Sequence, residues 1–179
     1  MQHFALTIIG RDRPGIVSQV TEILFQGGFN IADSSCSILG GQFSMILIIS
    51  NPAISTKEDF CDTFKPLEDK NLSVYIRTLK PGGEIRTELE GDLCMISVYG
   101  ADKPGIVYQV ARELGERNIN ITDLNTKLIG DKENPVYVMM LEAMLPENTE
   151  VEEVETWMQE LKQKLQVDIS VRSLVAMEL

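Results

Sequence analysis

The sequence is poor in the residues that most often carry catalysis or metal binding. It contains one histidine, His3, and three scattered cysteines, Cys36, Cys61 and Cys94. The cysteines form neither a CxxC pair nor a cluster with histidine, so a zinc site and a disulfide framework are not indicated. The single histidine has no partners in a Ser-His-Asp pattern. We therefore expect no catalytic residue, no metal and no cofactor, and we expect reduced, mostly buried thiols.

Positive charge and long apolar runs are also scarce. Sixteen Lys and Arg against 27 Asp and Glu give a formal net charge of −11. A surface of this sign repels a phosphate backbone, so we expect no direct contact with DNA or RNA. Apolar runs such as residues 45–49 are far too short to cross a bilayer, and the N-terminal segment lacks the features of a signal peptide. The sequence therefore predicts a cytoplasmic protein with no membrane partner.

The sequence does contain a repeat. GRDRPGIV begins at Gly10 and GADKPGIV begins at Gly100, and residues 10–33 match residues 100–123 at 12 of 24 positions without a gap. A repeat of about ninety residues is too long for a solenoid unit, so it indicates a duplicated small domain.

The composition between the two copies separates them. Residues 81–91 have the proline and glycine content of a linker. We therefore expect a first domain at residues 1–80 and a second domain at residues 92–179.

Both copies have the same predicted order of elements. A β-rich run ends at Gly10 or Gly100, and a one-sided helix follows it. After a hairpin, a second amphipathic helix is expected over residues 57–70 in the first copy and 151–165 in the second. The order strand, helix, strand, strand, helix, strand is the ferredoxin-like arrangement, with two helices on one face of an antiparallel four-stranded sheet. The sequence thus predicts an α+β fold of two such domains.

The repeated turn between the first strand and helix carries the candidate site. Asp12 is a suitable helix N-cap, and Pro14 is acceptable in a first turn. The first N–H groups of a helix lack intrahelical partners, and Gly15 leaves them open to a carboxylate. Asp12 can accept hydrogen bonds from an ammonium group, and the amide of Asn30 both donates and accepts. These residues suit an α-amino acid, but they suit a plain helix start as well.

The second copy repeats this turn with one conspicuous difference. The corresponding residues are Asp102, Pro104, Gly105 and Asn120. Tyr108 takes the place of Ser18, and a side chain of this size one helical turn from the loop would narrow or reshape one of the two pockets.

The pattern of strand, D-R-P-G-I-V, helix, F-N-I and strand resembles the ACT domain, a small ferredoxin-like module that commonly binds amino acids in regulatory proteins. The resemblance covers nearly the whole chain, twice. It implies a ligand at an interface between two ACT modules, contacted by the strand-to-helix loop and by the start of the second strand. The positions implied are Asp12, Pro14, Gly15, Ile16, Asn30, Ile31, Asp102, Pro104, Gly105, Ile106, Asn120 and Ile121.

A free-standing pair of ACT modules most resembles the group of glycine cleavage system transcriptional repressors. This resemblance implies a noncatalytic sensor of a small amino acid, glycine or a similar one, that modulates a transcriptional regulator protein. Two alternatives remain open. The modules could form a ligand-free interaction or oligomerisation unit, or the chain could be an enzyme related to the formyltetrahydrofolate deformylases, in which an ACT-like module precedes a catalytic domain.

The strand expected after the first hairpin is apolar on both faces. Met45 and Leu47 face one side, and Ile46 and Ile48 face the other. Both faces of such a strand need cover, so we expect a homo-oligomer, most simply a dimer.

Overall fold

The computed structural model describes residues 2–80, 91–131 and 135–174. The chain divides into two compact units, Met1–Ile85 and Arg86–Leu179, and each has its own hydrophobic core. The linker predicted at residues 81–91 lies, except for Gly91, outside the described residues. No helix among the described residues is long and apolar enough to span a membrane.

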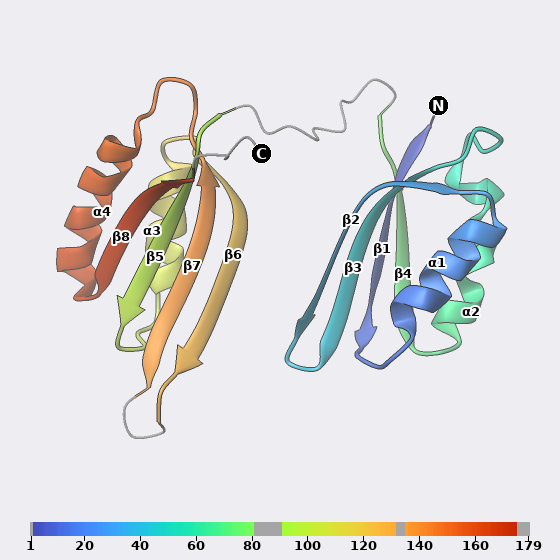
Figure 1. The fold of residues 1–179 in the computed structure, drawn as a ribbon, viewed down its shortest axis with the longest axis horizontal. Coiled ribbons are helices and arrows are strands. Elements are labelled where there is room, and N and C mark those ends of the chain that lie inside the picture. The colour runs from blue at the N-terminus through green and yellow to red at the C-terminus, as the bar shows by residue number, and fades with distance from the viewer. Residues whose placement is uncertain (1, 81–90, 132–134, 175–179) are drawn as a thin grey trace. The chain divides into compact units, whose positions relative to one another are not determined.

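The first domain contains one antiparallel sheet with its helices on one face (Figure 1). Its elements are β1 (His3–Arg11), α1 (Ile16–Gln26), β2 (Asn30–Leu39), β3 (Gln42–Ser50), the 3-10 turns η1 (Lys57–Asp59) and η2 (Cys61–Phe64), α2 (Lys65–Glu68) and β4 (Leu72–Thr78). The strand order is β2-β3-β1-β4. Each pair of neighbouring strands is antiparallel.

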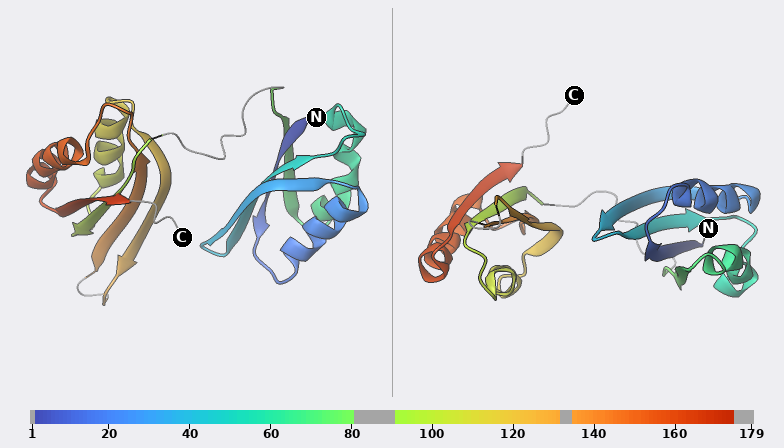
Figure 2. Two further views of the ribbon diagram at one scale, coloured as in Figure 1. Left: turned by 45° about the horizontal axis from the view of Figure 1, so that its top comes forward. Right: turned by 90° about the horizontal axis from the view of Figure 1, so that it is seen from below.

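The second domain repeats this arrangement. Its elements are β5 (Leu93–Gly100), α3 (Ile106–Gly115), β6 (Asn120–Ile129), β7 (Val136–Met144), α4 (Val151–Leu165) and β8 (Asp168–Leu174). The strand order is β6-β7-β5-β8. Figure 2 shows again that the helices of each domain lie on one face of its own sheet. The predicted α+β fold of two ferredoxin-like domains is confirmed.

The core of each domain lies between the sheet and the helices. Alternate residues of each central strand and one face of each helix point into it, as the periods of two and 3.6 residues require. In the first domain, the central strand and the first helix contribute Phe4, Leu6, Ile8, Ile16, Val20 and Leu24.

The opposite face of each sheet carries no helix of its own domain among the described residues (Figure 1). On this face of the first domain, Ile9, Ile46 and Tyr75 are 46%, 51% and 63% exposed. In the second domain, Tyr99 and Met140 are 42% and 43% exposed. The two-sided apolar character predicted for β3 is therefore confirmed, and its outer face presents apolar side chains to solvent.

The continuous helix predicted over residues 57–70 is wrong. The segment forms η1, η2 and the single turn of α2, although its apolar face is buried as expected through Phe60, Phe64 and Leu67. Pro66 lies in the first turn of α2, where its ring prevents the helix from continuing backwards with regular hydrogen bonds. In the second domain, which lacks such a proline, α4 spans Val151–Leu165 as predicted.

The expectation of mostly buried thiols is also wrong. Cys94 is buried in β5, but Cys36 and Cys61 are exposed. Cys36 lies on β2, an edge strand whose ten residues are all exposed. Cys61 lies in η2 between the buried Phe60 and Phe64, and it is itself exposed.

Candidate ligand-binding site

The helix after the repeated turn begins differently from the prediction. The N-cap of α1 is Gly15, with φ of 87°, and the N-cap of α3 is Gly105, with φ of 94°. Both values lie in the left-handed region that favours glycine. Asp12 and Asp102 stand three residues before these caps, so their prediction as N-caps is wrong. Neither helix receives a side-chain cap hydrogen bond from the described residues.

The first turn of α1 therefore keeps open backbone donors. The first intrahelical bond runs from the N–H of Gln19 to the carbonyl oxygen of Gly15, at 3.1 Å. The N–H groups of Ile16, Val17 and Ser18 precede this bond and have no side-chain cap. The helix dipole adds partial positive charge at this end. Together these features favour a small anionic group such as a carboxylate.

A cavity of about 730 Å³ opens beside this turn. Its lining residues are Asp12, Arg13, Gly15, Ile16, Val17, Ser18, Thr21, Cys36, Ser37, Ile38 and Phe43. The structure thus brings together three of the predicted residues, Asp12, Gly15 and Ile16. Pro14 belongs to the same turn. A carboxylate, open N–H groups and apolar walls in one cavity match the parts of a small α-amino acid.

The remaining predicted residues of the first copy, Asn30 and Ile31, lie at the other end of the sheet. Asn30 pairs with Ser50, which pairs with His3 at the start of β1, whereas the loop follows Arg11 at its end. Eight residues of strand separate the two ends by about 26 Å. Asn120 and Ile121 are separated from the second loop in the same way. Within one domain, the loop and the start of the second strand do not form one site.

The far end of β2 contributes to the cavity instead. The hairpin at Gly40 and Gly41 returns the chain to the loop, and the N–H of Asp12 donates to the carbonyl oxygen of Gly41 at 2.9 Å. This contact places Cys36, Ser37 and Ile38 at the cavity wall. These residues carry no motif, so the sequence did not predict them. Only the hairpin position and the strand register could have indicated them.

The two loops differ in how their basic residue is held. In the first domain, Arg13 donates from Nη2 to Oε1 of Gln19 at 2.9 Å. In the second, Lys103 donates to the carbonyl oxygen of Leu165 at 3.2 Å and to Oε1 of Gln166 at 3.1 Å. The buried Oε1 of Gln109, the counterpart of Gln19, has no partner in the described residues. The two loops are therefore chemically distinct.

Aromatic residues also distinguish the second loop. Tyr108, which replaces Ser18, is 64% exposed beside the first turn of α3. Tyr137 takes the place of Phe43, and burial raises the pKa of its hydroxyl, with a further upward contribution from the charge of Asp102 and an opposing hydrogen bond from Thr126. A tyrosine hydroxyl near Asp102 gives this loop a polar group that the first loop lacks. The sequence also predicts a longer hairpin in the second copy, at residues 130–134, and residues 132–134 of it lie outside the described residues.

The described residues contain no group of three His, Cys, Asp or Glu side chains placed to hold a metal ion. Burial raises the pKa of the Cys94 thiol to about 11, so this group stays protonated at neutral pH.

Comparison with known protein families finds an ACT domain in each of the two domains. Models of the ACT domain match residues 2–70 and residues 95–156. A UPF0237 protein of Methanococcus maripaludis is 37% identical over 77 residues, which are 43% of this chain and 83% of that protein. The glycine cleavage system transcriptional repressor of Escherichia coli is 29% identical over 126 residues, or 69% of this chain. The alignment spans 64% of that repressor's length.

A crystal structure of a protein from Galdieria sulphuraria has the same fold. It superimposes with a TM-score of 0.81 at 24% sequence identity, covering 97% of this chain and 99% of that one. Successive matches to two models of the ACT domain, one in each of the two domains that the structure separates, show that this chain belongs to the ACT domain family and carries two ACT domains in tandem.

Proposed function

We propose that this chain is a noncatalytic, cytoplasmic regulatory protein that binds a small amino acid, glycine or a similar one, at its β1–α1 loop and thereby modulates a transcriptional regulator. The observation that carries the proposal is the uncapped start of α1, which opens into a cavity with a carboxylate at its wall. The ligand carboxylate accepts hydrogen bonds from the N–H groups of the first turn. The ligand ammonium donates to Asp12.

The similarity to a glycine cleavage system transcriptional repressor supports the second half of the proposal. A chain with a net charge of −11 fits a protein partner better than DNA. The ligand changes the affinity for that partner only if it binds two arrangements of the protein unequally.

A homodimer is part of the proposal. The start of β2 does not reach the loop of its own domain, so Asn30 would complete a site only at the loop of another ACT module. β2 is an edge strand with ten exposed residues, and unpaired edges of this kind invite pairing with a second chain.

A ligand-free interaction module is the second candidate function. The exposed Ile9, Ile46 and Tyr75 on the outer face of the first sheet support it, because apolar side chains grouped on one face favour association with another protein. This function needs no occupant in the loop cavity, so ligand binding distinguishes the two candidates.

Calorimetry and melting curves with the common amino acids test the proposal. We expect at least one small amino acid to raise the melting temperature, and we expect Asp12→Asn to weaken its binding about tenfold, because one charge-assisted hydrogen bond is lost. Asp69→Asn, an exposed aspartate outside the cavity, is the matched control and should bind as the unmodified protein does. If no amino acid gives heat or a shift in melting temperature, the sensing function is wrong and the interaction module remains.

A further inference from the structure

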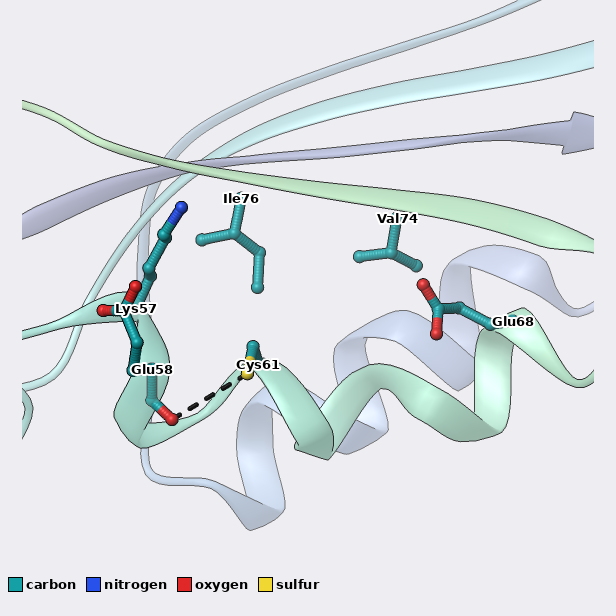
Figure 3. A pocket seen from close by; sticks show the side chains of 6 residues that line it. All are labelled: Lys57, Glu58, Cys61, Glu68, Val74 and Ile76. Atoms are coloured by element: carbon teal, nitrogen blue, oxygen red, sulfur yellow. Dashed lines mark hydrogen bonds between the residues drawn. The ribbon is translucent and has the colours of Figure 1, made fainter.

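A second cavity, of about 300 Å³, lies in the first domain between β4 and the segment formed by η1, η2 and α2 (Figure 3). Its lining residues are Lys57, Glu58, Cys61, Glu68, Val74 and Ile76. No residue lines both this cavity and the loop cavity. The two are therefore separate sites.

The interrupted helical segment leaves this space open. Val74 and Ile76 point from β4 toward the helices, yet both remain only partly buried. In the second domain, the continuous α4 buries Ile169, the counterpart of Val74, to 5% exposure, whereas Val171, the counterpart of Ile76, is partly buried as Ile76 is. The first domain thus has apolar strand surface that its own helices do not cover. This surface forms the floor of the cavity.

Charged groups stand at both ends of the floor. Figure 3 shows Lys57 beside Ile76, with Glu58 next to Lys57, and the carboxylate of Glu68 beside Val74. The two floor residues are two positions apart on β4, which corresponds to about 7 Å. In the described part of the chain, none of the three charged side chains forms a salt bridge. A ligand here would meet both signs of charge at one end, a negative charge at the other, and apolar surface between them.

We propose that this cavity binds a basic α-amino acid with a linear aliphatic side chain, such as lysine or ornithine. Its carboxylate pairs with the ammonium group of Lys57, its α-ammonium with Glu58, and its terminal ammonium with Glu68. Its methylene groups lie on Val74 and Ile76, as long cationic side chains do on apolar protein surface. Glycine has neither the chain nor the second ammonium, so this site selects a different ligand from the loop cavity.

A titration with L-lysine, followed by amide NMR shifts and calorimetry, tests the assignment on the full chain. We expect shifts in residues 57–68 and 74–76. L-Norleucine has the same chain without the terminal ammonium and should bind about fivefold more weakly, since one exposed ion pair is lost. Glu68→Gln should weaken lysine binding by the same factor and leave norleucine binding unchanged. The neighbouring Asp69→Asn, which does not line the cavity, should change neither.

Three results would overturn the assignment. One is equal affinity for lysine and norleucine, and another is the absence of any shift at millimolar lysine. The third is a set of shifts confined to the β1–α1 loop, which would place lysine in the other cavity. Asp12→Asn separates this inference from the loop proposal, because it should leave lysine affinity unchanged. The substituted side chains are exposed, and melting curves check that each variant remains folded.

Discussion

Gly10 and Gly100 stand at equivalent positions in two strands that other backbone approaches closely. A Cβ atom on Gly10 would lie 2.7 Å from Cδ2 of Leu72 and 2.8 Å from the carbonyl oxygen of Asn71. On Gly100 it would lie 2.8 Å from Cγ1 of Val167. Real Cβ atoms do not approach neighbours this closely, so the last strand of each domain fits only against a glycine. The first β-rich run does not end at its glycine, because β1 continues through Gly10 to Arg11, whereas β5 ends at Gly100 as predicted.

Gly10→Ala should lower the free energy of unfolding by about 1–3 kcal/mol, because the backbone oxygen of Asn71 cannot yield as a flexible side chain would. Gly115→Ala is the matched control with the opposite expected sign. Gly115 lies in α3 with open space around it, so alanine should stabilise by about 0.5–1 kcal/mol. Urea unfolding followed by circular dichroism measures both. A Gly10→Ala protein as stable as the unmodified one would show that β4 shifts freely.

At the scale of elements, periodicity predicted burial better than it predicted helix type. The pattern over residues 151–165 gave α4 correctly, because no residue within it opposes a helix. Phe60, Phe64 and Leu67 have the same spacing and are buried, but Pro66 divides their segment into short turns. The apolar pattern determines which face of a segment is buried. Whether the segment forms one continuous helix depends on its backbone hydrogen bonds.

The candidate site was predictable only where the repeat marks it. Asp12, Gly15 and Ile16 have identical counterparts in the second copy, and the structure places these three residues of the first copy at one cavity. The wall formed by Cys36 and Ile38 depends on where the hairpin brings the end of β2, and no motif at these positions records that distance. The part of the site that depends on strand pairing between distant residues could therefore not be predicted from the sequence.

A cationic side chain just after the end of α3 contacts α4. The guanidinium carbon of Arg117 lies 4.4 Å from the centroid of the Trp157 ring, and Nη1 lies 2.7 Å from Oε1 of Glu113. Arg117→Ala should destabilise the second domain by about 1–2 kcal/mol, because a cation–π contact and a partly buried ion pair are lost together. Tryptophan fluorescence during urea unfolding reports this directly.

Arg112→Ala is the matched control for Arg117→Ala. The guanidinium carbon of Arg112 lies 5.8 Å from the ring centroid of the exposed Tyr108, and the ion pair of Arg112 with Glu116 is also exposed. Its removal should change stability by less than about 0.5 kcal/mol. Equal losses for the two variants would mean that Trp157 is held by its apolar contacts alone.

At the scale of the whole molecule, the two domains have separate cores. The buried cluster of the first domain contains Leu6, and the cluster of the second contains Ile96 at the equivalent strand position. No residue belongs to both clusters. A cavity made in one core removes contacts only from that domain, so each domain should open as its own cooperative unit.

Cys94 provides a probe of opening in the second domain alone. It is fully buried with a raised pKa, so a thiol reagent should reach it only after that domain opens, whereas Cys36 and Cys61 should react at once. Ile96→Ala should speed modification of Cys94 at least about thirtyfold, because removing these buried methyl groups costs about 2 kcal/mol or more. Leu6→Ala should leave that rate within about twofold, although it destabilises the first domain by a similar amount. Mass spectrometry of the modified peptides measures each rate, and equal acceleration of Cys94 by both substitutions would show that the domains unfold together.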